Sequence, residues 1–149
     1  IARAIAKAEI DPSRLELEIT ESVFLDDGEN TDATFAALKK VGVRLALDDF
    51  GTGYSSLAYL KNLPVTTIKI DKSFILALAS DENDQQIVHT VLSLASVFNL
   101  KVVAEGVEDV ASLEILKDWG CDIVQGYYIS RPLSRSDLED WLQNTPFGE

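Results

Sequence analysis

Short stretches of alternating apolar and polar residues recur along this chain, and stretches with apolar residues at helical spacing separate them. Alternation with a period of two is typical of β-strands, and apolar residues three or four positions apart are typical of amphipathic helices. The pattern predicts strands over residues 15–20, 43–48, 65–71, 101–104 and 123–127. It predicts helices over 1–8, 34–40, 57–63, 84–98, 110–119 and 136–144, and a helical turn over 73–78.

Residues that end helices or cap their first turn support these boundaries. We expect helices to close before Pro12, Gly42, Pro64 and Gly120. We expect first-turn caps from Asn30 or Thr31, from Asp109, and from Ser136 together with Glu139.

Polar residues lie near the ends of the predicted strands, opposite an apolar face. They are Glu18, Asp48, Lys69, Glu105 and Gln125. A doubly wound parallel sheet is apolar on both faces, whereas the interior of a (β/α) barrel opens at a mouth where polar groups from several strands converge. The alternation of strands and helices therefore predicts an α/β fold, a TIM-type (β/α) barrel, in preference to an open sheet.

The number of strands is too small for a closed barrel. A full barrel needs eight βα units and about 250 residues, and only about five units can be placed here. We therefore expect residues 1–149 to be the C-terminal portion of a single barrel domain, whose missing strands lie N-terminal in a longer parent protein or are replaced by another chain. The absence of methionine and the start within a helical pattern agree with this expectation.

Charge narrows the choice of ligand. The 149 residues carry a formal net charge of -12, which argues against a DNA or RNA polymer as partner because such binders need a basic footprint. An anionic ligand would therefore need metal ions as intermediaries. The single cysteine, Cys121, excludes an internal disulfide. The sequence contains no apolar run of about twenty residues, which is the length that a membrane span needs.

The stretch 45–57, LALDDFGTGYSSL, is the strongest candidate for a site. It runs from a strand through the adjacent carboxylates of Asp48 and Asp49 into a glycine loop and then a helix. Two neighbouring carboxylates repel one another unless a cation lies between them. This arrangement is typical of binding sites in α/β proteins.

Five motifs in order give a family resemblance. They are EITE (18–21), DDFGTG (48–53), KID (69–71), EGVE (105–108) and QGY (125–127). In sequence and spacing they closely resemble the EAL-domain family of cyclic di-GMP phosphodiesterases, over about residues 15–133. The resemblance implies a modified TIM barrel that hydrolyses cyclic di-GMP to linear pGpG with Mg²⁺ or Mn²⁺ in bacterial signalling.

The resemblance also implies roles for single residues. Glu18 and Asp48 would ligate one metal ion, Asp49 would hold a second, and Lys69 would contact the attacking water. Glu105 resembles the general base, with action through the metals as the alternative. Glu21 would anchor the glycine loop. The remaining members of the site would surround the substrate and the metal ligands: Asp71, Glu108 and Gln125.

The family further implies a homodimer, a sensory or GGDEF domain in the parent chain and a cytoplasmic location, with membrane tethering of the parent left open. Two parts of the family pattern have no counterpart in this sequence: the signature Glu-Ala-Leu segment, whose glutamate ligates a metal, and the asparagine of the following strand. We therefore expect this chain alone to bind metal weakly and to hydrolyse little.

The residue types suit this chemistry without reference to the family. A phosphodiester is a poor electrophile because its negative oxygens repel the nucleophile, and two cations can neutralise that charge and activate a bound water. Carboxylate oxygens are the hard ligands that Mg²⁺ and Mn²⁺ prefer, and the lack of clustered His and Cys argues against zinc. Lys69 among several acids should stay protonated and offer positive charge to the transition state.

Several alternatives stay open at this stage. Taken singly, Asp71 and Glu108 could be helix caps or solvated charges. Lys69 could be part of a structural ion pair. Tyr127 and Tyr128 could be core residues or could line a guanine pocket. A catalytically silent cyclic di-GMP receptor or protein-interaction scaffold is the main alternative function. A TIM-barrel metal lyase with a lysine base is disfavoured, because Glu18 with the two aspartates suggests two cations.

Overall fold

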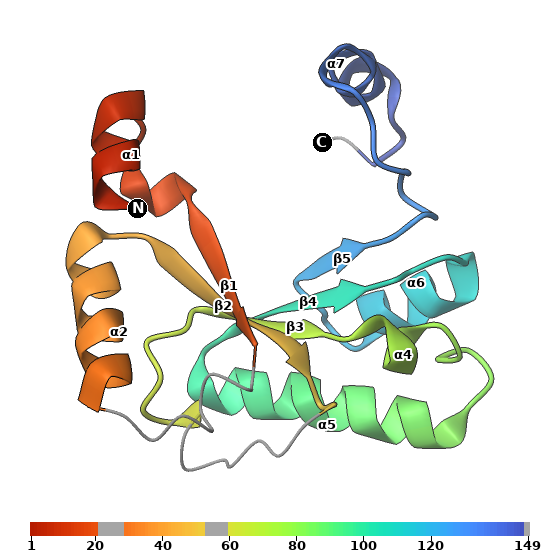
Figure 1. The fold of residues 1–149 in the computed structure, drawn as a ribbon. Coiled ribbons are helices and arrows are strands. Elements are labelled where there is room, and N and C mark those ends of the chain that lie inside the picture. The colour runs from red at the N-terminus through yellow and green to blue at the C-terminus, as the bar shows by residue number, and fades with distance from the viewer. Residues whose placement is uncertain (21–28, 53–59, 148–149) are drawn as a thin grey trace.

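The structure is a computed structural model and describes residues 1–20, 29–52 and 60–147 (Figure 1). Within these ranges the strands are β1 (Glu16–Thr20), β2 (Arg44–Phe50), β3 (Thr67–Ile70), β4 (Lys101–Glu105) and β5 (Ile123–Gln125). The helices there are α1 (Ala2–Ala8), α2 (Glu29–Val41), α4 (Lys72–Ile75), α5 (Glu82–Phe98), α6 (Val110–Asp118) and α7 (Arg135–Asn144), with a 3-10 helix η1 (Pro12–Arg14).

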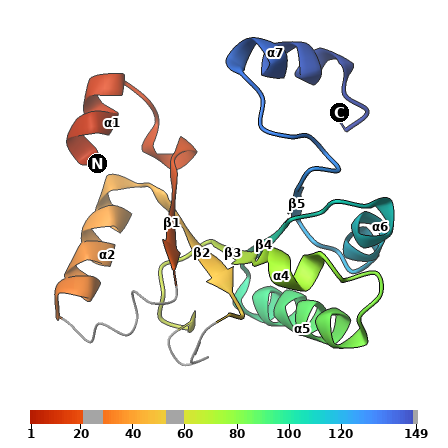
Figure 2. The ribbon, with the colours of Figure 1, turned by 45° about the vertical axis from the view of Figure 1, so that its right-hand side comes forward.

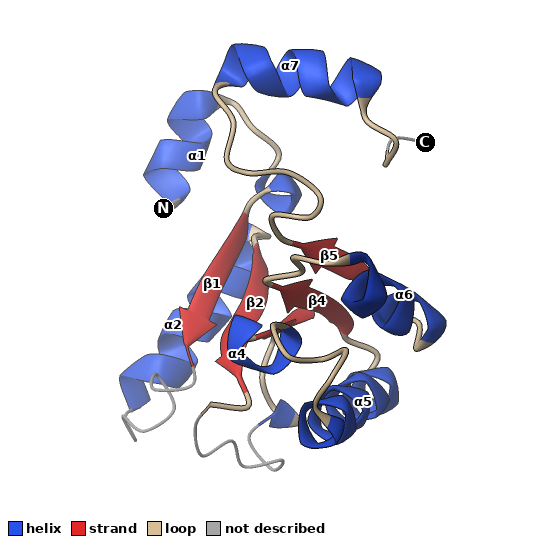
Figure 3. Cartoon of the chain, turned by 90° about the vertical axis from the view of Figure 1, so that its right-hand side faces the viewer, coloured by secondary structure: helices blue, strands red, loops and turns tan. Residues whose placement is uncertain are grey.

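The strands form one five-stranded parallel sheet in the order β1-β2-β3-β4-β5, so that each strand pairs with the next along the chain. A parallel sheet that grows in one direction through right-handed crossovers keeps its helices on one face. The helices α2, α5 and α6 lie around the outside of the strands in this way (Figure 3). The predicted fold class is confirmed: five parallel strands, with α2, α5 and α6 on their outer face, give the α/β fold of an incomplete barrel.

The hydrophobic core lies between the sheet and these outer helices. Leu45 and Leu47 of β2 and Ile68 and Ile70 of β3 are at most 2% exposed. They belong to one cluster with residues of the outer helices, namely Phe35, Val88, Val91, Leu92, Ala95 and Leu116. Because successive strand residues point to opposite faces, the residues between them are left for the inner face of the barrel, and this is where the polar candidates lie.

Two helix starts differ from the prediction. The helix predicted over 34–40 begins at Glu29, so Asn30 and Thr31 are within α2 and not at its cap. The last helix begins at Arg135, and its cap is Ser134, whose hydroxyl accepts from the backbone N–H of Asp137 at 3.3 Å. The prediction of Ser136 with Glu139 was wrong because Glu139 pairs with Arg135, at 3.0 Å, on the exposed face of the helix.

Two strand ends also differ from the prediction. The strand predicted to end at Asp48 continues to Phe50, with a shift in its pairing to β3 between Leu47 and Phe50. Asp49 adopts a left-handed backbone with φ of 54°, which lets Phe50 enter the core while Asp49 stays exposed. The strand predicted to reach Tyr127 ends at Gln125. Most of the helix predicted over 57–63 lies outside the described residues.

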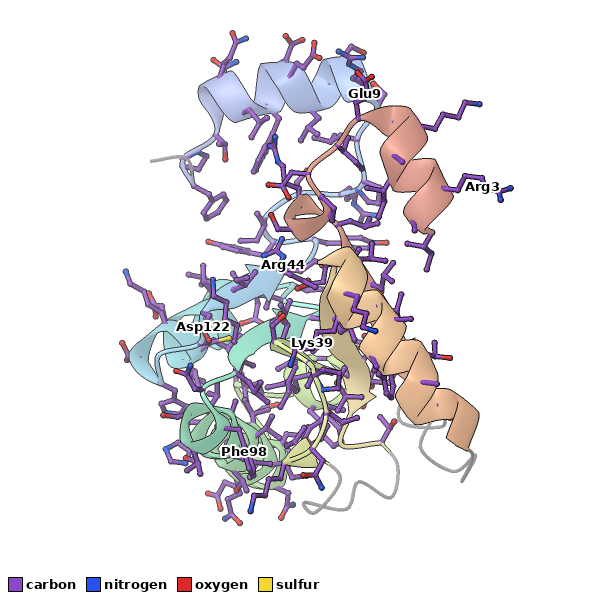
Figure 4. All side chains as sticks on the ribbon, turned by 90° about the vertical axis from the view of Figure 1, so that its left-hand side faces the viewer. Arg3, Glu9, Lys39, Arg44, Phe98 and Asp122 are labelled. Carbon is purple, nitrogen blue, oxygen red and sulfur yellow. The ribbon has the colours of Figure 1, made fainter. Side chains whose placement is uncertain are left out.

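The C-terminal helix stands apart from the outer layer, whereas α1 lies beside α2 (Figure 1). α7 lies away from α5 and α6 in both ribbon views (Figures 1 and 2), and it buries none of its residues. α1 leads through η1 into β1, and only Ile5 of α1 is buried. Its exposed Arg3 points away from the rest of the chain (Figure 4).

The segments that follow β4 and β5 are held against one another by their backbones. The N–H of Val107 donates to the carbonyl of Gln125 at 3.1 Å, and the N–H of Tyr128 donates to the carbonyl of Val107 at 3.0 Å. A Cβ on Gly126 would lie 2.1 Å from the carbonyl oxygen of Val107. Only glycine fits here, so Gly126 fixes the relative position of the strand ends that carry Glu105 and Gln125.

We therefore expect Gly126→Ala to lower the free energy of unfolding by about 3 kcal/mol, since the Val107 backbone must move to admit the methyl group. Gly120→Ala is the matched control: Gly120 has φ of 76° but its Cβ would meet nothing within 4 Å, so it should lose only about 1 kcal/mol through backbone strain. Urea denaturation of both variants measures the difference. A Gly126→Ala protein at least as stable as the control would contradict the close approach.

Candidate active site

Four strands each contribute a charged residue to one cluster on the inner face of the sheet. Glu18 comes from β1, Asp48 from β2, Lys69 from β3 and Glu105 from β4. Each lies near the carboxyl end of its strand, and in the register of the sheet Asp48 lies beside Thr20 of β1. Parallel strands bring their carboxyl ends to the same edge, so these side chains meet on one rim.

The ammonium of Lys69 is the point where they meet. Its Nζ lies 2.6 Å from Glu18 Oε1, 2.8 Å from Glu105 Oε1 and 3.1 Å from Asp48 Oδ1. The Lys69 side chain is 9% exposed, whereas that of Glu18 is 54% exposed. One buried cation thus holds together carboxylates from three other strands, which confirms that the predicted residues converge.

The contacts of Lys69 determine its protonation. Burial acts to lower the pKa of the Lys69 ammonium, but the bonds to Glu105, Glu18 and Asp48 outweigh burial and raise that pKa above its ordinary value of 10.5. The side chain therefore stays charged throughout the physiological range. This agrees with the sequence-based expectation that Lys69 supplies positive charge.

The carboxylate of Asp48 is paired with one cation in this structure. Its buried Oδ1 lies 3.1 Å from the ammonium of Lys69. This ion pair offsets the cost of burying a charged oxygen. The oxygen donors of Asp48 and Glu18 suit a hard divalent cation such as Mg²⁺ or Mn²⁺.

Over the ranges that the structure describes, no three His, Cys, Asp or Glu side chains are arranged as a ready metal site. The Lys69 ammonium lies between Glu18 and Glu105 and contacts both. The carboxylates fit a divalent cation in the type of their donor atoms, while the described residues alone do not form a complete ligand set.

Asp49 does not join the cluster around Lys69. It is exposed, and its carbonyl accepts bonds from the N–H of Thr52 at 3.3 Å and from the Thr52 hydroxyl at 2.8 Å. Its role as a ligand of a second metal stays a prediction.

The structure describes three of the four remaining predicted site residues. Asp71 caps α4 by accepting from the N–H of Ser73 at 3.0 Å, and hydrogen bonds from Ser73 lower the pKa of its carboxyl group. Gln125 lies beside Glu105 in the register of β4 and β5. Glu108 is exposed on the segment after β4. Glu21 lies outside the described residues.

One polar contact on the same face was missed by the sequence reading. The hydroxyl of Thr67 on β3 donates to Oε2 of Glu16 on β1 at 2.9 Å. The signal was present in the sequence, because Glu16 and Glu18 are separated by one residue of the same strand and so share a face.

The family model for the EAL domain matches residues 1–132 of this chain. The chain belongs to the EAL family. A cyclic di-GMP phosphodiesterase of Pseudomonas aeruginosa is 44% identical to it over 135 residues, which are 91% of this chain and 23% of that protein.

Solved structures agree with the EAL assignment. The EAL domain of DcpA from Mycobacterium smegmatis is 44% identical and has a TM-score of 0.87, over 95% of this chain and 64% of that one. BlrP1 from Klebsiella pneumoniae, solved as a complex with manganese and cyclic di-GMP, is 30% identical with a TM-score of 0.81, over 88% of this chain and 33% of that one.

The EAL chain spans about a fifth of the length of the curated relatives that it matches, with shares of 21%, 23% and 18% for three of them. None of the helices in the described part of the chain combines the length and the apolar character that a bilayer crossing requires.

Because Lys69 neutralises three carboxylates, we expect Lys69→Met to lower the free energy of unfolding by about 2 kcal/mol at pH 8. A raised pKa in the folded state means that this stabilisation is complete below pH 10.5, the ordinary pKa of lysine, and declines as the pH rises further. The difference between wild type and variant should therefore be constant from pH 7 to 10 and shrink above it.

Urea denaturation across this pH range measures the effect. Lys72→Met, which changes an exposed lysine at the start of α4, is the control and should stay within about 0.5 kcal/mol of wild type. A Lys69→Met protein as stable as this control at pH 8 would show that the ion pairs contribute nothing to folding.

Proposed function

We propose that this EAL chain is the C-terminal portion of a single EAL-type barrel, and that the complete barrel is a metal-dependent phosphodiesterase that hydrolyses cyclic di-GMP to linear pGpG. The observation that carries the proposal is the convergence of Glu18, Asp48 and Glu105 on the ammonium of Lys69 at one rim. Relatives named as cyclic di-GMP phosphodiesterases support the substrate.

In this proposal Glu18 and Asp48 hold one Mg²⁺ or Mn²⁺ and Asp49 holds a second. Bound cations of this kind neutralise the charge of a phosphodiester and lower the pKa of a water molecule. The meeting of the Glu18 and Asp48 carboxylates at one rim supports their assignment as ligands. The manganese complex of a structural neighbour supports the type of metal.

The chain's own residues supply the rest of the chemistry. Lys69 stays protonated and places its positive charge at the rim, where it stabilises the negative charge that develops on the attacking water and the phosphate oxygens. Glu105, whose carboxylate lies at the rim 2.8 Å from Lys69 Nζ, is the acceptor for the proton of that water in this proposal, with action through the metals as the alternative. Gln125 beside Glu105 orients substrate, with Asp71, Glu108 and Glu21 completing the surroundings.

The context of the chain is part of the proposal. We expect the remaining strands of the barrel to come from the same parent protein, with a sensory or GGDEF domain attached, a homodimeric assembly and a cytoplasmic location. The chain covers 64% of one solved EAL domain, which supports a barrel completed by further residues.

A second candidate is a catalytically silent receptor or scaffold that binds cyclic di-GMP without turnover. The observation that favours it is the cluster itself, because the Lys69 ammonium contacts Glu18, Asp48 and Glu105 and so balances part of their charge. Calorimetry with cyclic di-GMP, with and without Mg²⁺, separates the two: a receptor binds the dinucleotide and leaves it intact.

The decisive experiment measures cyclic di-GMP hydrolysis by the full protein that contains this chain, with Mg²⁺ or Mn²⁺. We expect Asp48→Asn to lower kcat/KM by at least about 100-fold, because even outer-shell changes at metal sites cost about 10 to 100-fold. Asp118→Asn, on an exposed residue at the end of α6, should retain full activity.

The isolated chain should turn over much more slowly than the full protein, since it lacks part of the ligand set. Equal rates for the two proteins would refute the need for further strands. Turnover that is unaffected by Asp48→Asn, or that persists after removal of divalent metals, would refute the metal-dependent mechanism.

A further inference from the structure

The short helix α4 touches the segments that follow two of the site strands. It begins two residues after β3, and its residue Ile75 is fully buried. A Cβ on Gly51, directly after β2, would lie 3.1 Å from Cε2 of Phe74. A Cβ on Gly106, directly after β4, would lie 2.6 Å from Cβ of Lys72. The backbones of both glycines therefore lie against α4.

Phe74 is held in place on this helix. Asp71 caps α4 by accepting from the N–H of Ser73 at 3.0 Å, and Ile75 fixes the other end of α4 in the core. Phe74 itself is partly buried and packs against the same hydrophobic core. Its ring therefore presents a fixed edge to the Gly51 backbone.

The turn that contains Gly51 also sets the backbone of Asp49. Thr52 closes this turn, because its N–H and its hydroxyl both donate to the carbonyl of Asp49, at 3.3 and 2.8 Å. Asp49 has φ of 54° and Gly51 has φ of 99°. A left-handed backbone at a residue other than glycine is unfavourable and persists only where the surrounding structure enforces it.

Two contacts with the rest of the protein restrain the turn. The side chain of Phe50 is 6% exposed and enters the core, and the ring of Phe74 borders Gly51. Without the ring, the Gly51 backbone would gain freedom and Asp49 could return to a commoner φ. Such a change of φ would swing the Asp49 carboxylate to a new direction.

We propose that Phe74 is a positioning residue for Asp49: its ring holds the Gly51 backbone, and this keeps Asp49 in the conformation in which its carboxylate serves the second metal ion. The role of the metal rests on the proposed phosphodiesterase function, whereas the restraint of the turn does not. If Phe74 were purely structural, its replacement would lower stability and leave the turn and the metal unaffected.

Two measurements on the full protein that contains this chain test the proposal. Both use Phe74→Leu, which stays apolar but loses the edge of the ring. Without metal, the amide of Thr52 should exchange its hydrogen at least about 5-fold faster, because the turn opens more often. Mass spectrometry of the peptide that contains Thr52 measures this exchange.

The second measurement is calorimetry with Mn²⁺. One of two Mn²⁺ binding constants should weaken about 10-fold in Phe74→Leu, as is typical when a residue that orients a metal ligand is changed. Asp49→Asn identifies the site by weakening the same constant, since asparagine tolerates the left-handed backbone.

The matched control is Phe98→Leu. Phe98 lies at the C-terminal end of α5 (Figure 4) and, like Phe74, is partly buried against the core. The change removes the same atoms, but the Thr52 exchange rate and both Mn²⁺ constants should stay within about 2-fold of wild type. Should Phe74→Leu fail to unfold cooperatively in urea, Phe74→Met carries the same expectations.

Three results would overturn the proposal. They are unchanged exchange at Thr52 in Phe74→Leu, faster exchange with unchanged Mn²⁺ constants, and equal changes in Phe98→Leu, which would reflect a general loss of stability. A wild-type protein that binds no Mn²⁺ would refute the metal-dependent function separately. The exchange rate at Thr52 then decides by itself whether Phe74 restrains the turn.

Discussion

The ion cluster around Lys69 is the constraint on which the rest of this structure depends. Three carboxylates on the inner face of a sheet repel one another, and a single buried ammonium from the central strand compensates them. Because the partners come from β1, β2 and β4, the cluster forms only when these strands are in register. The same contacts that hold the strands together also keep Lys69 charged, so stability and chemistry share one set of atoms.

The order of the strands allows the fold to carry such a charged cluster. The crossover helices α2, α5 and α6 cover one face of the sheet, where Leu47, Ile68 and Ala104 enter a common core. The inner face does not pack against these helices, so it need not be apolar and can carry charges. Two small residues then allow close approaches. The methyl group of Ala46 leaves room for side chains that cross β2, and the lack of a Cβ at Gly126 lets the segments after β4 and β5 come together.

Membership of the EAL family and the geometry of the rim support each other from independent directions. The family model rests on the order of residues in the sequence, whereas the contacts of Lys69 rest on their arrangement in space. The cluster is compatible with both proposed functions, a metal-dependent enzyme and a silent receptor, because a lysine that neutralises the carboxylates suits either one. Metal binding by the completed barrel is what separates them.

The sequence by itself determined the strands, most helices, the barrel class and the identity of Glu18, Asp48, Lys69 and Glu105 as residues that meet, because hydrophobic alternation and the polar ends of strands are local signals. It misplaced the caps at Asn30 and Ser136, where several nearby polar residues can cap and only packing selects one. Tertiary structure alone decided that Asp49 turns out of the cluster, since its left-handed backbone follows from burying Phe50. It alone decided the bridge from Glu16 to Thr67, since that contact joins residues 51 positions apart across an intervening strand.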